Sequence, residues 1–232
     1  MNATIGADDP IPIDLSIYLV TDSDQANGAG RTLVDTVAAA VAGGVTTVQL
    51  REKNTPARQQ VDLLQSLSEV LPQHVTLLVN DRVDVYLAAR NRGARVHGVH
   101  VGQDDLPVED VRRLIGPDAV LGLSAATPEQ ITAAEASDAR VDYLGIGALR
   151  TTVSKADAPE PIGAERIGRL AASTHLPAVA IGGVVPDDLP GLRTAGLDGA
   201  AVVSWICAAQ HPRHAAAELA RAWEELTPRD VS

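Results

Sequence analysis

Eight short apolar runs recur along this chain, and segments with helical spacing separate them. Strands that are buried on both faces read as continuous aliphatic runs. Alternation of such runs with helical segments predicts repeated βα units with right-handed crossovers, and eight units predict a closed (β/α)8 TIM barrel of the α/β class. An open doubly wound sheet is the alternative, because periodicity does not show whether the edge strands meet. The runs lie at residues 17–20, 45–49, 75–79, 96–101, 119–123, 141–146, 177–181 and 200–203.

The helical segments carry start and stop signals. Thr55-Pro56 and Thr127-Pro128 place a hydroxyl before a proline, which suits a helix whose first turn is capped by that hydroxyl. Glycines are typical of helix ends, where a residue adopts the left-handed conformation. Such glycines stand at 43–44, 93, 116 and 196, and the predicted helices span residues 31–42, 56–71, 83–92, 108–115, 128–136, 163–173, 187–195 and 212–226.

Length and charge limit the class of protein. The 232 residues suit one barrel, for which we expect a flexible tail at 1–15, a catalytic domain at 16–226 and a tail at 227–232. The net charge of −11 disfavours nucleic-acid and membrane partners, which are drawn by positive fields. A single cysteine, Cys207, suits a reducing compartment. With no signal peptide or spanning segment, the sequence predicts a soluble cytoplasmic protein, and leaves open whether it is a homo-oligomer.

Cationic side chains end the second run. Gln49, Arg51 and Lys53 alternate along the chain, so a strand would place all three on one side. The planar guanidinium of Arg and the compact charge of Lys suit a diphosphate. The alternative is a solvated charge cluster without a ligand.

Acidic side chains end the third and fourth runs. Asn80-Asp81 follows the third run, and Gln103-Asp104-Asp105 follows the fourth. Carboxylates from neighbouring strand ends suit Mg²⁺, which completes its octahedron with water and phosphate. Alternatively, Asp81 caps the next helix and Asp104 or Asp105 shapes a turn.

Hydroxyls and glycines end the later runs. The segment 150–155 carries Thr152, Ser154 and Lys155, which could cradle a phosphate. Gly182-Gly183 and Ser204 follow the seventh and eighth runs, where barrel enzymes often bind phosphate through backbone N–H groups.

Other candidates are weaker. Gly28-x-Gly30 lacks the context of a dinucleotide fingerprint. His97 and His100 alternate on the fourth run without further zinc ligands, so a packed or supporting role is favoured over metal. Cys207 reads as a small buried residue, and Ser124, outside any nucleophile elbow, reads as a ligand contact.

Taken together, these motifs resemble the thiamine phosphate synthase family over nearly the whole predicted barrel. The set is specific, although no single member is. The motifs are Tyr18-Leu19-Val20-Thr21-Asp22, Val48-Gln49-Leu50-Arg51-Glu52-Lys53, Asn80-Asp81-Arg82-Val83-Asp84, His100-Val101-Gly102-Gln103-Asp104-Asp105-Leu106-Pro107, Gly122-Leu123-Ser124, Thr152-x-Ser154-Lys155 and Ala180-Ile181-Gly182-Gly183.

The resemblance implies a reaction and its residues. Members of the family join an aminopyrimidine methyl diphosphate to a thiazole phosphate and release diphosphate, by a dissociative path assisted by Mg²⁺. By resemblance, Asp81 and Asp105 hold Mg²⁺, and Gln49 contacts the pyrimidine. The implied catalytic residues are Arg51, Lys53, Ser124 and Lys155, with Asn80 also on the pyrimidine diphosphate, and the implied thiazole-phosphate site is Thr152, Val153, Ser154, Gly183, Val203 and Ser204.

Several positions depart from the family pattern. Ser154 stands where threonine is common, Ala148 replaces a proline, the segment 88–96 is longer, and Ala126 stands where a histidine is frequent. Three rivals stay open: a thiazole tautomerase, a non-catalytic thiazole-phosphate-binding regulator and a phosphosugar isomerase. The tautomerase needs no diphosphate clamp, so Arg51 and Asp81 count against it.

Overall fold

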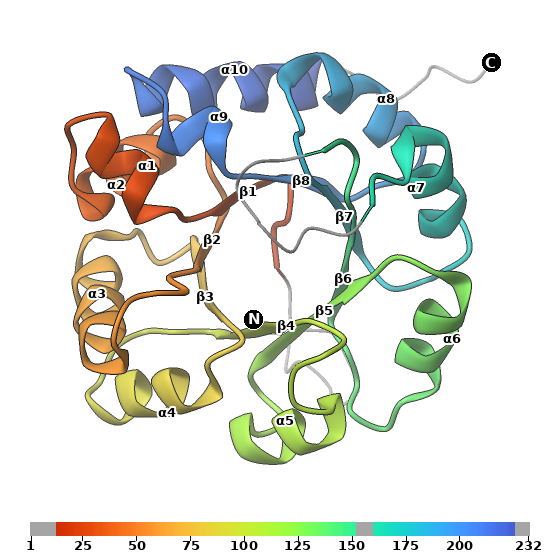
Figure 1. Cartoon of the computed structure of the whole chain (residues 1–232), viewed down its shortest axis with the longest axis horizontal. Coiled ribbons are helices and arrows are strands. Elements are labelled where there is room, and N and C mark those ends of the chain that lie inside the picture. The colour runs from red at the N-terminus through yellow and green to blue at the C-terminus, as the bar shows by residue number, and fades with distance from the viewer. Residues whose placement is uncertain (1–12, 152–159, 226–232) are drawn as a thin grey trace, which may run out of the picture.

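Eight parallel strands form a closed barrel in which each strand pairs with its neighbours in the sequence (Figure 1). The structure, a computed structural model, describes residues 13–151 and 160–225. The strands are β1 (Ile17–Val20), β2 (Thr47–Leu50), β3 (Thr76–Asn80), β4 (Gly98–Val101), β5 (Val120–Ala125), β6 (Tyr143–Gly147), β7 (Ala178–Ile181) and β8 (Gly199–Val202). Because β8 pairs with β1, the predicted barrel is confirmed and the open sheet is excluded.

Helices surround the barrel on its outer side (Figure 1). Each predicted helical segment contains a helix, and the predicted bounds of 108–115 and 128–136 are those observed. Two helices of six and four residues were not predicted, because they are too short to show a helical period. The helices are α1 (Ser23–Gly28), α2 (Leu33–Val41), α3 (Ala57–Val70), α4 (Val83–Asn91), α5 (Val108–Ile115), α6 (Pro128–Ala136), α7 (Gly163–Ala171), η1 (Pro186–Asp188), α8 (Leu189–Thr194), α9 (Ser204–Cys207) and α10 (Pro212–Glu224).

The helix signals are confirmed with one exception. Thr127 Oγ1 accepts a hydrogen bond from the Gln130 backbone N–H at 3.3 Å, as predicted. The prediction for Thr55 is wrong: α3 begins one residue later than expected, so Pro56 is its N-cap and no side chain caps the helix. The prediction that glycines follow the helix ends is confirmed, since Gly44, Gly93, Gly116 and Gly196 all have positive φ.

Alternation along the strands divides the apolar side chains into two layers. On β1, Ile17 and Leu19 pack outward under the helices, whereas Tyr18 and Val20 point into the barrel. The interior group is small and contains two of the three tyrosines of the chain. Its members are Leu15, Tyr18, Val20, Leu78, Val120, Tyr143, Val179 and Ala201.

The predicted tail boundaries stay predictions, because residues 1–12 and 226–232 lie outside the described part of the chain. Within residues 13–151 and 160–225, no helix has the length and apolar character needed to cross a membrane.

Arg112 on α5 contacts both the segment before β5 and the segment between α6 and β6. Its guanidinium donates to the carbonyl oxygens of Ala119 at 2.5 Å and Ala139 at 2.7 Å, and pairs with the Asp142 carboxylate at 2.9 Å. The side chains of the pair are only 13% and 11% exposed. Removal of one partner of a buried pair leaves an uncompensated charge. We expect Arg112→Ala to lower the free energy of unfolding in urea by about 3 kcal/mol.

The neighbouring Arg113 provides the control, since its side chain is 74% exposed and pairs with Asp110 at the surface. Exposed pairs contribute less than about 1 kcal/mol. Equal losses for Arg112→Ala and Arg113→Ala would show that the buried pair contributes no special stability.

Candidate active site at the carboxyl ends of the strands

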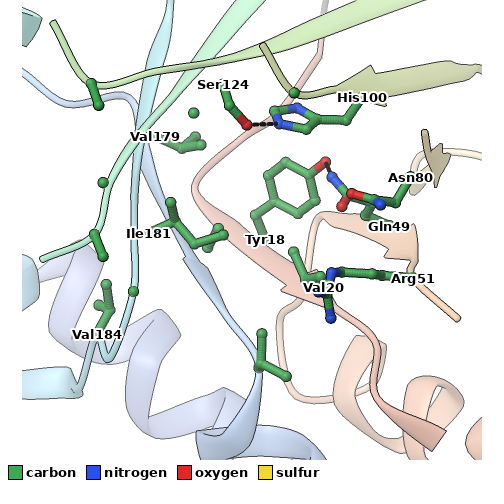
Figure 2. Close-up of a pocket in the computed structure, with 18 of the residues that line it drawn as sticks. Tyr18, Val20, Gln49, Arg51, Asn80, His100, Ser124, Val179, Ile181 and Val184 are labelled. Carbon is green, nitrogen blue, oxygen red and sulfur yellow. Dashed lines mark hydrogen bonds between the residues drawn. The ribbon is translucent and has the colours of Figure 1, made fainter. Parts of the chain in front are cut away.

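A cavity of about 600 Å³ opens at the carboxyl ends of the strands, a size that suits small organic ligands. Figure 2 shows polar side chains, among them Gln49 and Asn80, facing the apolar Val179 and Ile181 across it. The predicted residues that line it are Gln49, Arg51, Lys53, Asn80, Asp81, Asp105, Ser124, Gly183, Val203 and Ser204. The predicted Thr152, Val153, Ser154 and Lys155 lie outside the described residues.

The end of β2 supplies the cationic side of the cavity. Leu50 is buried in the outer layer, and the alternation that places it there turns Gln49 and Arg51 inward. Thr21 at the end of β1 holds this segment, because its Oγ1 accepts from the Arg51 backbone N–H at 2.9 Å and donates to Glu52 Oε1 at 3.1 Å. Burial raises the pKa of Glu52. The predicted convergence of Gln49, Arg51 and Lys53 is confirmed.

The ends of β3 and β4 supply two carboxylates. Asp81 has φ of 60°, its backbone N–H donates to His100 O at 2.8 Å, and its Oδ2 accepts from Asn80 Nδ2 at 2.5 Å. Burial and the adjacent Asp105 carboxylate raise the pKa of Asp81 to about 6, against the opposing effects of the Asn80 amide and the Lys53 charge. The Asp105 carboxylate therefore lies close enough to disfavour the charged form of Asp81.

The sequence left helix capping open for Asp81 and turn shaping open for Asp105, and the structure bears out only the second. The N-cap of α4 is Arg82, with no side-chain cap, so Asp81 does not cap that helix. Asp105 does shape its turn, since Oδ2 accepts from the Gly102 backbone N–H at 2.7 Å. Its carboxylate also lies beside that of Asp81.

The chemistry of this donor pair fits Mg²⁺. Two hard carboxylate oxygens face a cavity that is also lined by cations for a phosphate, which is how Mg²⁺ is bound in phosphate-transfer sites. No group of three or more His, Cys, Asp or Glu side chains with metal-binding geometry occurs among the described residues. The set thus suits an ion that keeps water and substrate oxygens as its remaining ligands.

A buried polar network forms the floor of the cavity. His100 Nε2 and Ser124 Oγ are 3.0 Å apart, and Gln49 Nε2 donates to Tyr18 Oη at 2.6 Å (Figure 2). His100 is 9% exposed and packs 5.4 Å from the Tyr143 ring, so the packed position favoured from sequence is confirmed. Sequence reasoning missed Tyr18 and Tyr143 as site residues, although the period of two along each strand could have placed them inside.

The loop after β7 lines the side of the cavity opposite the cationic residues. Gly182 and Gly183 have φ of 100° and 68°, and a Cβ atom at Gly182 would lie 2.7 Å from Ala148 Cβ. Arg150 holds this turn: its Nη1 donates to Gly183 O at 2.9 Å and to Asp188 Oδ2 at 2.6 Å. The turn is thus fixed with Gly183 at the cavity, where an anion can approach the backbone closely.

Two weaker sequence candidates take no part in this site. Cys207 is fully buried on α9, and burial raises the pKa of its thiol to about 12, so it is a packed apolar residue as predicted. Gly28 is the last residue of α1 and lines no part of the cavity. Ala126 does line it, so the position where a histidine is frequent brings no ionisable group there.

Comparison with known proteins identifies relatives over most of the chain. The family described as thiamine monophosphate synthase matches residues 17–206. A thiamine-phosphate synthase of Corynebacterium efficiens is 42% identical over 203 residues, which cover 88% of this chain and 92% of that protein. The thiamine-phosphate synthase of Xanthobacter autotrophicus is 45% identical over 211 residues, covering 90% and 96%.

Solved structures agree with these matches. A thiamine phosphate pyrophosphorylase from Pyrococcus furiosus superposes with a TM-score of 0.79 at 32% identity, covering 91% of this chain and 96% of that one. A phosphoribosyl anthranilate isomerase from Thermus thermophilus, at 14% identity and a TM-score of 0.62, shares the barrel fold. With its sequence matched over most of its length and its strand ends carrying the expected side chains, the chain belongs to the thiamine monophosphate synthase family.

Proposed function

We propose that this protein is a thiamine phosphate synthase, a transferase that forms a C–N bond and releases diphosphate. Its substrates would be 4-amino-2-methyl-5-(diphosphooxymethyl)pyrimidine and thiazole phosphate. One observation carries the proposal: Arg51 and Lys53 share a cavity with the Asp81 and Asp105 carboxylates. Cations beside a pair of metal-binding carboxylates suit a diphosphate that leaves with its charge neutralised.

The chain would act mainly by positioning and by charge. Mg²⁺, held by Asp81 and Asp105, would neutralise charge that develops on the departing diphosphate. Arg51, Lys53 and Lys155 would bind that diphosphate. The amino group of the pyrimidine donates electrons to the cation left on the ring methylene, and the thiazole nitrogen captures it. No protein base is needed for that bond.

The thiazole phosphate would bind on the other side of the cavity. Gly183, Val203 and Ser204 line it after β7 and β8, where barrel enzymes commonly bind phosphate. Thr152, Val153 and Ser154 are assigned to the same phosphate by family resemblance. The apolar Val179 and Ile181, which face the polar side chains across the cavity, suit the organic rings (Figure 2).

The rival functions fit the site less well. A tautomerase requires a proton-transfer group at the thiazole, and Ala126 provides none at the position where a histidine is frequent. A binding protein without activity has no use for a diphosphate clamp and a pair of facing carboxylates. A cytoplasmic location is part of the proposal, since the one cysteine suits a reducing compartment.

An assay of diphosphate release tests the function. The protein is incubated with the pyrimidine diphosphate and the thiazole phosphate, each alone and together, with and without Mg²⁺. Release that requires both organic substrates and Mg²⁺ supports the synthase. Binding of thiazole phosphate without any release, or proton exchange on the thiazole alone, would favour a rival.

Lys155 provides a separate test. Loss of one preorganised charge contact to a leaving group typically lowers turnover by about a hundredfold or more. We expect Lys155→Ala to show this loss in single-turnover experiments with both substrates saturating. Near-normal single-turnover kinetics would contradict the role of Lys155 while leaving the assignment of the reaction intact.

A further inference from the structure

A continuous chain of hydrogen bonds crosses the barrel beneath the cavity. Gln49 Nε2 donates to Tyr18 Oη at 2.6 Å, and Tyr18 Oη lies 2.7 Å from Tyr143 Oη. Tyr143 Oη lies 2.9 Å from His100 Nδ1, and His100 Nε2 lies 3.0 Å from Ser124 Oγ. We call these five side chains the relay. It begins and ends on residues assigned to the pyrimidine, and Tyr143, near its middle, does not line the cavity.

The barrel makes room for the relay with two glycines. A Cβ atom at Gly122 on β5 would lie 2.3 Å from Tyr143 Cζ, and one at Gly145 on β6 would lie 3.1 Å from His100 Cε1. No side chain fits at Gly122 while the Tyr143 ring stays where it is. The two glycines therefore leave the space that the two rings occupy, and hydrogen bonds orient the rings there.

The hydrogens of the relay can be counted. Each phenol has one hydrogen, and burial raises the pKa of both Tyr18 and Tyr143, so both stay neutral. Tyr18 Oη already accepts from Gln49, so its own hydrogen needs an acceptor, and its only other described partner is Tyr143. Tyr143 must then donate to His100 Nδ1. Each step follows because a buried hydroxyl hydrogen without an acceptor is strongly disfavoured.

The reverse order fails at Tyr18. If His100 Nδ1 carried the hydrogen, it would donate to Tyr143 and Tyr143 would donate to Tyr18. The Tyr18 oxygen would then accept twice, and its hydrogen would have no acceptor among its described partners. A doubly protonated imidazole leads to the same conflict, because it also donates from Nδ1.

We infer that the relay fixes His100 as the tautomer with hydrogen on Nε2, which donates to Ser124 Oγ and leaves the Ser124 hydroxyl to donate to a ring nitrogen of the pyrimidine. The inference rests on the proposed function for the identity of the ligand. His100, Tyr18 and Tyr143 are positioning residues that act through Ser124. Because a hydroxyl is a weak acid, it binds the ring nitrogen without protonating it, and the ring keeps the electrons that it donates to the cation.

The tautomer is tested directly by ¹⁵N NMR of the protein labelled at histidine, with the His100 ring assigned by comparison with His100→Gln. The expected result is a hydrogen on Nε2 and a bare Nδ1 at neutral pH in the full-length, ligand-free protein. A hydrogen on Nδ1 overturns the inference. This measurement needs no substrate, so its result does not depend on whether the proposed function is correct.

The effect on Ser124 is tested with two pyridine analogues of the pyrimidine diphosphate, each with one ring nitrogen replaced by C–H. One of them is expected to bind wild type about tenfold more weakly than the parent compound, the size of one lost hydrogen bond. Ser124→Ala should abolish this difference. Tyr143→Phe should reduce it, although Tyr143 does not line the cavity, because the hydrogen bond that keeps His100 Nδ1 an acceptor is lost. Tyr86→Phe on α4 is the matched control and should retain it.

If Tyr143→Phe retains the full discrimination, the relay does not set the Ser124 hydroxyl and the inference is wrong. A failure of the parent diphosphate to bind wild type would instead contradict the proposed function, whatever tautomer the NMR experiment detects.

Discussion

Arg51→Ala is expected to lower kcat for diphosphate release by about a hundredfold or more, because it removes a preorganised charge from the leaving group. Arg51 extends from the end of β2 into the cavity (Figure 2). Its backbone N–H donates to Thr21 Oγ1 at 2.9 Å. The side chain can therefore be deleted without moving the strand. The measurement is steady-state kinetics with both substrates, accompanied by single-turnover experiments that isolate the chemical step.

Two variants sharpen this test. Arg51→Lys keeps the charge but loses the planar fork that binds two phosphate oxygens, so its activity should lie between those of wild type and Arg51→Ala. Arg58→Ala removes an equal charge from the exposed face of α3 and should leave kcat unchanged. If Arg51→Ala raises only KM, Arg51 binds the substrate ground state and transition state equally, and its proposed role in expelling diphosphate is wrong.

Asp81→Asn is expected to abolish the response of the protein to Mg²⁺ in both activity and thermal stability. Asparagine tolerates the positive φ of 60° at this position, so the backbone should be retained. Burial and Asp105 raise the pKa of Asp81 to about 6. When the pKa of a carboxyl is higher in the folded protein than in the unfolded chain, the stability of the fold falls as the pH rises through the folded-state pKa. At pH 7.5 the metal-free protein therefore carries an unfavourable charge on Asp81.

The substitution should thus act in opposite directions on the two forms of the protein. Without Mg²⁺ at pH 7.5, Asp81→Asn should melt at the same temperature as wild type or higher, because the repulsion with Asp105 is gone. With saturating Mg²⁺ and pyrimidine diphosphate, wild type should gain stability by linkage and the variant should not. Activity of the variant should be lower by about a hundredfold or more.

Asp118→Asn, an exposed aspartate that precedes β5 and so lies at the opposite end of the barrel, is the matched control. It should retain both the Mg²⁺ activation and the Mg²⁺-dependent rise in melting temperature. A normal Mg²⁺ response in Asp81→Asn would refute the assignment of the metal to this pair of strand ends.

The site could be predicted in outline because the sequence pattern and the barrel geometry are linked. Parallel strands all end on one rim, so side chains that follow apolar runs meet there whatever their separation in the chain. This reasoning is sufficient to bring together Arg51, Asp81 and Ser204, and all three line one cavity. It also predicts that Gln49 and Arg51 share a side, since strands alternate with a period of two.

Details that depend on a single contact were less accessible. The hydroxyl of Thr55 looked like a cap, but α3 begins one residue further along. From the sequence, Asp81 could equally have capped α4, but Arg82 is the N-cap and Asp81 adopts a positive φ of 60° before it. Helices α1 and α9 were missed because four to six residues do not complete enough turns to show a period.

By itself, the sequence determined the repeating βα units, the rim on which the polar residues lie and the family to which the chain belongs, since all three follow from local order along the chain. Only the tertiary structure decided that β8 closes on β1 and that Tyr18 meets Tyr143, 125 residues away, in a hydrogen bond of 2.7 Å. Such a contact depends on the barrel's closure and on the space beside Gly122, where a Cβ atom would collide with the Tyr143 ring. Periodicity shows which side of a strand a residue occupies, whereas packing decides which side chain it touches there.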